Sequence, residues 1–252
     1  MMLKKILIFS ILLMSSAFAD EAADKAEFKK LYAEFSDLFA NSEAIEPIIE
    51  IAEKLYSLSP LAYGKNSNNT AVVTYNLATL YDEKGGETNS EDEKRASELY
   101  KEYFTILDGQ KKPLDNQYFQ QYIAFVKSEH NAFGYRSDTS YSKKAIEIAK
   151  SINLSNLERA NLDFLIANHR YYSGKPTDAK KLFTNAHKKY IAEYGLNHYK
   201  VGETTFWLAQ IDFKNGRHKR AGENYLSAME ILSKSELESA AAMVLITHAA
   251  LV

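Results

Sequence analysis

Six histidines are the side chains of this sequence best suited to bind a metal ion or to transfer a proton in catalysis. They stand at positions 130, 169, 187, 198, 218 and 248. No two of them are three or four residues apart, the spacing that places two ligands on one face of a helix. The sequence therefore predicts no helical zinc site, and no metal or other cofactor is expected.

Carboxylate pairs are a second source of chemistry, because two of them at a fixed separation act as general acid and base. Glu91, Asp92 and Glu93 are adjacent, but we expect them in a loop from Gly85 to Glu93, which would not hold such a separation. Glycine-rich phosphate loops and the Gly-x-Ser-x-Gly and His-Glu-x-x-His motifs are absent from the sequence. An enzyme is therefore the less favoured alternative. A pocket in which two ionisable groups converge would indicate an enzyme.

The elements that must position any site are predicted by a recurring small–large–small pattern. Its two copies, forty-two residues apart, are Ala179, Phe183, Ala186 and Ala221, Tyr225, Ala228. Spacings of four and three residues place each set on one helix face. Ile166-Ala167 and Leu208-Ala209 precede the copies, across turns that contain Gly174 and Gly216. This arrangement predicts antiparallel helices in close contact, joined by glycine turns.

The same organisation extends over most of the sequence. Tyr63-Gly64-Lys65-Asn66 and Tyr194-Gly195-Leu196-Asn197 are two copies of one connector, 131 residues apart, and the helices that follow them stay in register. The loop expected from Gly85 to Glu93 is six residues longer than its counterparts. It is either a solvated surface loop or a loop that contacts a partner. We expect helix pairs near 24–58, 70–108, 116–152, 156–193 and 199–233, and the first helix of a further unit at 236–252.

The first nineteen residues predict a secretory signal peptide. Lys4 and Lys5 precede an apolar run from Ile6 to Met14, and Ala17-Phe18-Ala19 predicts cleavage after Ala19. The apolar run is shorter than the ~20 residues of a membrane-spanning helix, which favours cleavage over retention as an anchor. No later stretch is long enough to span a membrane. We therefore expect a periplasmic protein whose repeat domain covers residues 20–252.

Composition excludes several classes of partner and site. The sequence contains no cysteine, which excludes disulfides, cysteine metal ligands and lipid attachment of the bacterial kind. After the predicted signal peptide, the sequence contains 29 lysines and arginines and 33 acidic residues, whereas a nucleic-acid-binding protein usually has a basic excess. No nucleic-acid partner is expected. The basic turn at 217–220 indicates a solvated helix start in preference to a contact for an acidic partner.

The repeats resemble the tetratricopeptide repeat (TPR), which has a leucine–small pair on its first helix, then an alanine and an aromatic residue on its second. Three copies carry the resemblance: Leu77, Ala78, Tyr81, Ala96, Tyr100; Ile166, Ala167, Ala179, Phe183, Ala186; and Leu208, Ala209, Ala221, Tyr225, Ala228. Thr74, Asp163 and Thr205 stand where a tryptophan often opens the motif. The connectors look like those of the forty-two-residue repeats in kinesin light chains. The resemblance implies an all-α fold, a right-handed superhelical solenoid of antiparallel helix pairs.

The resemblance also implies a concave groove, lined by the first helix of each pair, that binds a protein or peptide partner. The groove positions lie two residues before and after the leucine of each copy: Tyr75, Thr79, Phe164, Asn168, Phe206 and Gln210. Asn168 occupies the place of an asparagine that clamps a carboxyl terminus in some TPR proteins. Phe164 stands where the companion lysine belongs, so we do not infer that clamp. Alternatively, the aromatic groove residues only pack between neighbouring hairpins.

These observations predict an exported scaffold that binds a protein or peptide. A weaker resemblance, to the amino-terminal repeats of exported TonB-family proteins, implies a TonB-linked envelope system for energy transduction or transport. A self-associating structural protein of the envelope is an alternative, because the helix expected at 236–252 is apolar on more than one face. Such a face implies either docking on another polypeptide or a polypeptide that continues past Val252.

Overall fold

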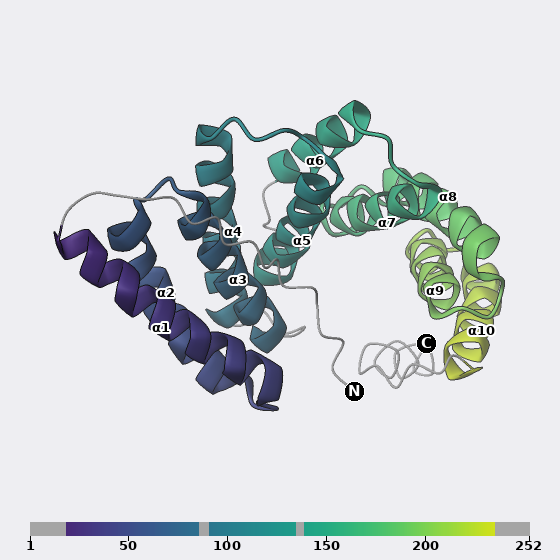
Figure 1. Cartoon of the computed structure of the whole chain (residues 1–252). Helices are drawn as coiled ribbons and strands as arrows, with labels where there is room; N and C mark the ends of the chain where they lie inside the picture. The colour runs from purple at the N-terminus through teal and green to yellow at the C-terminus, as the bar shows by residue number, and fades with distance from the viewer. Residues whose placement is uncertain (1–18, 86–90, 135–138, 235–252) are drawn as a thin grey trace. The chain divides into compact units, whose positions relative to one another are not determined.

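The structure, a computed structural model, describes residues 19–85, 91–134 and 139–234. All regular elements within these ranges are helices, labelled α1 to α10 in Figure 1. The predicted all-α fold of antiparallel helix pairs is therefore confirmed. The helices belong to two compact units, divided between Ser137 and Asp138. We call α1 to α5 unit 1 and α6 to α10 unit 2.

Unit 1 stacks its helices in the order of the sequence. They are α1 (Ala19–Asn41), α2 (Ile45–Tyr63), α3 (Asn68–Gly85), α4 (Glu91–Gly109) and α5 (Asn116–Phe133). Each helix packs on the next, so α3 pairs with α4 and α5 lies against α4. Between α4 and α5, the ring centroid of Phe104 lies 5.2 Å from that of Tyr118 and 4.9 Å from that of Tyr122. These large rings hold α5 beside the hairpin of α3 and α4.

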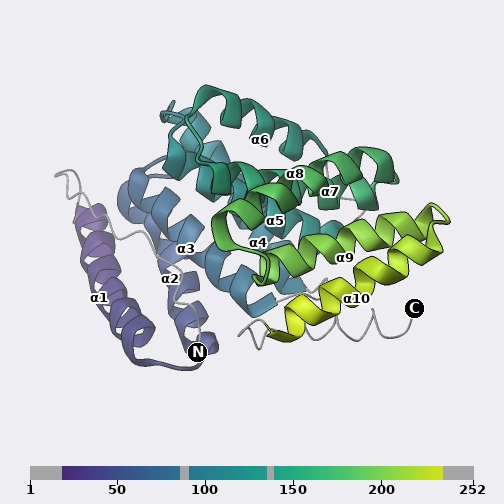
Figure 2. The same ribbon diagram turned by 90° about the vertical axis from the view of Figure 1, so that its right-hand side faces the viewer.

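Unit 2 consists of α6 (Thr139–Ser151) and two hairpins. The first hairpin is α7 (Asn156–Tyr172) with α8 (Pro176–Tyr194), and the second is α9 (Tyr199–Lys214) with α10 (His218–Lys234). Figure 2 shows α9 and α10 side by side. Contacts between α8 and α9 join the hairpins, and a 2.5 Å hydrogen bond between Ser142 Oγ and His169 Nδ1 links α6 to α7.

The small–large–small pattern forms the core of both hairpins of unit 2, as its spacing predicts. Ala179, Phe183 and Ala186 have no exposed surface, and the corresponding Tyr225 is only 4% exposed. The alanines let the helices approach closely, and Phe183 reaches Ile211 of the next hairpin. Each hairpin therefore buries its apolar face against its neighbour, which is how a repeat array gains its stability.

Gly174 and Gly216 close the turns inside the two hairpins. Their φ angles are 75° and 73°, in the left-handed region that glycine adopts without strain. At the first turn, the N–H of Lys175 donates to the carbonyl of Arg170 at 2.8 Å, and an equivalent bond closes the second turn. These bonds satisfy carbonyls at the end of the preceding helix and reverse the direction of the backbone within a few residues.

Gly202 brings α9 close to α10. A Cβ atom on Gly202 would lie 2.8 Å from Leu232 Cγ, so Leu232 would have to move. We expect Gly202→Ala to lower the free energy of unfolding of unit 2 by about 1–3 kcal/mol, although alanine favours helices. Gly222 on α10 is the matched control, because nothing lies within 4 Å of an added Cβ there. Gly222→Ala should raise stability by up to about 1 kcal/mol. Urea denaturation measures both variants, and a gain in both would contradict this packing.

The second helix of the first pair ends later than expected. The sequence predicts that Ser59-Pro60 ends the second helix, but α2 continues to Tyr63. Pro60 lacks the N–H that would donate to the carbonyl of Tyr56, and the Ser59 hydroxyl donates to that oxygen instead, at 3.2 Å. The helix ends where Gly64 adopts a φ of 86°.

The acidic residues at 91–93 are helical, not part of a loop, since α4 begins at Glu91. Carboxylates in a first turn interact favourably with the helix dipole, and Glu93 is fully buried.

The helices of the pair expected at 116–152 fall into different units, α5 in unit 1 and α6 in unit 2. The predicted signal peptide up to residue 18, residues 86–90 and the helix expected at 236–252 lie outside the described residues.

Candidate functional site

A pocket of about 340 Å³ lies in unit 1 between α3 and α5, and side chains of α4 complete its wall. We call it the α3–α5 pocket. Its lining comes from α3, from α4, from the segment that leads into α5 and from α5 itself: Asn68, Ala71, Val72, Tyr75, Asn76, Tyr103, Leu107, Lys112, Pro113, Asp115, Gln117, Tyr118 and Gln121. The volume lies at the lower end of the range of ligand-binding pockets. The predicted groove residue Tyr75 is part of the wall.

The pocket forms because α3 and α5 each direct one face toward it. The lining residues of α3 recur at spacings of three and four, which places them on one side of the helix. The helix α5 begins at Asn116, because the Asp115 carboxylate accepts a hydrogen bond of 2.8 Å from the backbone N–H of Tyr118. This N-cap sets the helical phase in which Gln117 and Gln121 line the pocket.

The two predicted groove residues of α3 have different surroundings. The ring centroid of Tyr75 lies 5.6 Å from that of Tyr100 and 5.0 Å from that of Tyr103. Thr79 is only 7% exposed, and its hydroxyl donates to the Tyr75 carbonyl at 3.0 Å. Tyr75 therefore lines the pocket, whereas Thr79 is part of the packing behind it.

Two carboxamides in the pocket wall differ in how they are held. The Tyr103 hydroxyl donates to Gln121 Oε1 at 2.7 Å, which fixes the Gln121 amide. Asn76 is 5% exposed, and its Oδ1 is buried without a hydrogen-bond partner among the described residues. A buried amide oxygen without a partner costs about 1–3 kcal/mol. Asn76 thus carries an unused hydrogen-bonding group in the wall of the pocket.

The tyrosines of the pocket are uncharged near neutral pH. Burial raises the pKa of Tyr75 and of Tyr103 above the ordinary value. Burial also raises the pKa of Tyr118, and the hydrogen bond from its hydroxyl to Asp108, 3.0 Å long, raises it further. None of these hydroxyls is therefore a phenolate that would act as a base under physiological conditions.

Buried tyrosines also predict a loss of stability at alkaline pH. Burial raises the pKa of Tyr100, Tyr103 and Tyr190 above the ordinary 10.0. The unfolded protein loses these protons near that pH while the folded protein keeps them, so their contribution is complete below pH 10 and falls as the pH rises above it. Each contributes up to about 1.4 kcal/mol per pH unit. Urea unfolding at a series of alkaline pH values measures the slope, which Tyr100→Phe should reduce. An unchanged slope would contradict this cause.

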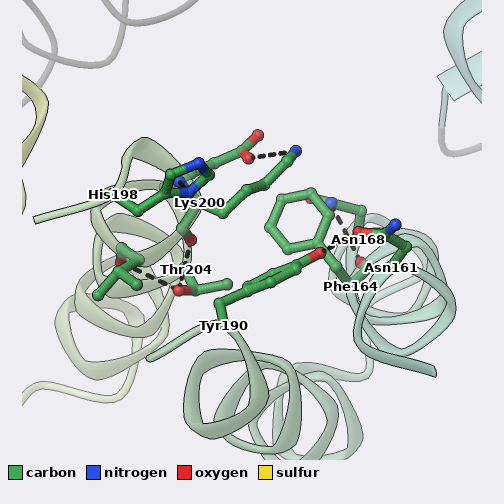
Figure 3. Close-up of polar contacts among 9 residues, drawn as sticks. Asn161, Phe164, Asn168, Tyr190, His198, Lys200 and Thr204 are labelled. Atoms are coloured by element: carbon green, nitrogen blue, oxygen red, sulfur yellow. Dashed lines mark hydrogen bonds and ion pairs between the residues drawn. The ribbon is translucent and has the colours of Figure 1, made fainter. Parts of the chain in front are cut away.

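In unit 2, side chains of α7 and α9 meet around Phe164, as Figure 3 shows. The Lys200 ammonium lies 5.1 Å from the Phe164 ring centroid and 2.9 Å from Glu203 Oε2. Burial by itself lowers the pKa of Lys200, but the charge of Glu203 raises it, and the net pKa lies above the ordinary value. Lys200 therefore stays cationic and covers the ring of Phe164. This predicted groove residue is already engaged by its neighbours.

The asparagines near Phe164 are hydrogen-bonded within unit 2. The Asn168 side chain, which is half-buried, donates through Nδ2 to the Phe164 carbonyl at 3.2 Å. Asn161 Oδ1 accepts a hydrogen bond of 2.8 Å from the Tyr190 hydroxyl, which ties α7 to α8 (Figure 3). His198 is the N-cap of α9 and accepts from the backbone N–H two residues later. These contacts stabilise the arrangement of α7, α8 and α9.

The predicted groove residues of α9 lie in different environments. Phe206 is 3% exposed, and its ring centroid lies 5.7 Å from those of Trp207 and Tyr225 in the core of the α9–α10 hairpin. Gln210 is half-buried one turn further along α9. Of the three aromatic groove residues, Tyr75 lines the pocket, Phe164 is covered by Lys200, and Phe206 packs in the core.

Sequence reasoning missed the polar part of the pocket: Asn76, Tyr103 and Gln121. The repeat pattern marks residues that pack and the positions two away from the leucine, whereas Asn76 immediately precedes Leu77. One signal was available, since a polar residue among the apolar residues of a helix face is costly unless it has a partner. Helix α5 contributes Gln121, and its hydrogen bond with Tyr103 of α4 is visible only in the fold.

Other features of the described residues point to less specific sites. A hollow of about 530 Å³ between α1 and α2 is lined by Leu31, Leu58 and Leu61 with a charged rim, and no buried polar atom without a partner lies in its lining. Among the described residues, no group of three or more histidine, aspartate or glutamate side chains could hold a metal ion. None of the described helices is both long and apolar enough to cross a bilayer.

Comparison with solved structures finds the same fold in TPR-like repeats. The protein is similar to two crystal structures from Podosopora anserina, described as a kinesin light chain with nearly identical TPR-like repeats. A variant of that protein gives a TM-score of 0.60 at 13% identity, over 86% of the present sequence and 98% of its own. The other gives 0.59 at 13% identity, over 88% and 100%. No family model and no curated protein matches the sequence. The protein therefore folds as TPR-like helical repeats.

Proposed function

We propose that this protein is a scaffold for protein–protein interaction and that it binds an extended segment of a partner at the α3–α5 pocket. The observation that carries the proposal is the buried, unpaired amide oxygen of Asn76 in a pocket that Tyr75 and Tyr103 also line. The TPR-like fold supports it, because stacked hairpins offer extended surfaces to a partner. Rigid tyrosine rings add contact area at a low cost in entropy.

Catalysis has less support from the same pocket. Its charged residues are Lys112 and Asp115, and the Asp115 carboxylate already accepts the N–H of Tyr118 at 2.8 Å. The pocket tyrosines have raised pKa values and do not act as bases near neutral pH. This lining does not combine a nucleophile with a base that would activate it. The site therefore favours binding over reaction.

Filling the pocket tests the proposal. Val72 is half-buried in the wall, and Val72→Trp would occupy much of the space. We expect the tagged protein to recover a partner from an envelope extract, and Val72→Trp to reduce that recovery at least about tenfold. Leu226→Trp is the matched control, because Leu226 is 64% exposed on α10, in the other unit. Equal recovery by the two variants would contradict binding at the pocket.

We further propose that the protein is exported to the periplasm and belongs to a TonB-linked envelope system. The leader pattern of the first nineteen residues supports export to the periplasm, and the resemblance to TonB-family repeats supports a role in a TonB-linked envelope system for energy transduction or transport. Sequencing of the protein recovered from the periplasm should give Asp20 as its first residue. A protein that keeps Met1 and stays in the cytoplasm would contradict export. Loss of the gene should reduce TonB-dependent uptake, and unchanged uptake would remove that part of the proposal.

A further inference from the structure

We infer that the α3–α5 pocket recognises an uncharged, interior stretch of peptide backbone through its amide groups, and not a charged terminus. This inference rests on the proposed function and names the chemistry of the ligand. The ligand is a secondary amide, with an N–H donor and a C=O acceptor, carried by a residue with an aliphatic side chain. Two carboxamides, an apolar wall and the balance of charge in the pocket support it.

Asn76 supplies an adaptable contact. Its Oδ1 has no hydrogen-bond partner among the described residues, and no bond to them holds the carboxamide in one orientation. The group can therefore turn about its Cβ–Cγ bond and present either the acceptor oxygen or the donor nitrogen to a ligand. A backbone N–H fits the oxygen, and a backbone carbonyl fits the nitrogen. A ligand that offers both groups would provide the hydrogen bond that the buried oxygen lacks.

Gln121 supplies a fixed contact on the opposite side, from α5. Its Oε1 already accepts the Tyr103 hydroxyl at 2.7 Å, so the amide hydrogens on Nε2 are the part of the group that remains for a ligand. Gln121 is 6% exposed and lines the pocket together with Asn76. One donor in a fixed orientation and one amide that adapts are complementary to the alternating C=O and N–H groups of an extended peptide.

The remaining lining excludes a strongly charged ligand. Ala71, Val72 and Leu107 form an apolar part that fits an aliphatic side chain. Lys112 and Asp115 have opposite charges in the same lining, so the site has no net charge to hold a carboxylate. A carboxylate also accepts hydrogen bonds without donating any, and it would leave the Asn76 oxygen unpaired. An interior peptide unit has the groups that the pocket requires.

Small amides test this ligand class on the full-length protein. The probes are N-acetyl-L-leucine N-methylamide; N-acetyl-N-methyl-L-leucine N,N-dimethylamide, a dimethylamide that keeps both carbonyls but has no N–H; and 4-methylpentanoate, an aliphatic carboxylate without an amide that stands for a peptide terminus. Titrations are followed by nuclear magnetic resonance at the side-chain amide signals of Asn76 and Gln121. We expect saturable shifts with the methylamide, in the millimolar range of so small a ligand. The dimethylamide and the carboxylate should bind at least about tenfold more weakly.

Two variants separate the specific contact from general packing. Asn76→Leu should remove the preference for the methylamide, whereas Asn168→Leu, at an amide of unit 2 that is bonded to the Phe164 carbonyl, should keep it. Equal binding of the three probes, tighter binding of the carboxylate, or no shift at Asn76 would overturn the inference. If Val72→Trp still reduced recovery of the protein partner in that case, the pocket would remain the binding site and only the ligand class would be wrong.

Discussion

Phe183→Ala is expected to lower the free energy of unfolding of unit 2 by about 3–5 kcal/mol. Phe183 is fully buried, and its ring stacks on Trp207 of α9 with 5.8 Å between centroids and 2° between planes. It also meets Phe164 of α7 at 5.5 Å. The substitution leaves a cavity where α7, α8 and α9 come together, and close-packed helices relax only partly into such a space. A loss of this size is a large part of the stability of a typical domain.

Trp207 allows this loss to be measured in unit 2 itself. It is the one tryptophan of the sequence, so urea unfolding followed by its fluorescence reports on unit 2, whereas far-ultraviolet circular dichroism reports on all helices. Phe213→Ala is the matched control, because it removes the same side chain from a site that is 42% exposed. We expect it to cost less than about 1 kcal/mol. Equal losses in the two variants would contradict the packing described for Phe183.

Asn76→Leu is expected to have two effects of opposite sign. It should raise the free energy of unfolding of unit 1 by about 1–2 kcal/mol, because leucine leaves no buried polar atom unpaired and favours a helix more than asparagine does. It should also reduce recovery of the protein partner at least about tenfold, since the contact with the ligand's backbone is lost. Opposite signs of this kind are typical of residues that serve binding at the expense of stability.

Unfolding in urea, followed by circular dichroism, measures the first effect, and recovery from an envelope extract measures the second. Asn168→Leu is the control for the loss of an amide, and it should change stability by no more than about 0.5 kcal/mol, because Asn168 is only half-buried. A lower stability of Asn76→Leu would mean that the Asn76 amide contributes to folding. Asn76 would then serve the packing of unit 1, and its amide would not be held ready for a ligand.

The helices could be predicted from the sequence because their determinants are local. Ala179, Phe183 and Ala186 share a face at helical spacing, and all three are fully buried in the structure. Gly174 adopts the positive φ that its place between two periodic segments indicates. Helix ends were harder to predict, because a helix breaker such as Pro60 is accommodated when the neighbouring Ser59 hydroxyl takes over the freed carbonyl.

The candidate site could be predicted only in part, because it depends on contacts between helices. Tyr75 belongs to the expected groove residues and lines the pocket. Gln121 comes from α5, and its hydrogen bond with Tyr103 is specified by how α5 packs on α4. Likewise, nothing in the repeat pattern indicates that Lys200 covers Phe164. The division into two units also follows from contacts between helices, and the repeat pattern, which groups residues 116–152 as one pair, does not indicate it.

Photo-crosslinking tests most directly whether a partner occupies the α3–α5 pocket. A photoreactive phenylalanine analogue replaces the exposed Gln117 at the rim of the pocket in one variant and the exposed Leu226 in another. On irradiation in cells, we predict a covalent adduct with a partner protein at position 117 and none at position 226, and excess N-acetyl-L-leucine N-methylamide should suppress the adduct in extracts. Adducts at position 226 alone, or at neither position, would contradict the binding of a partner at this pocket.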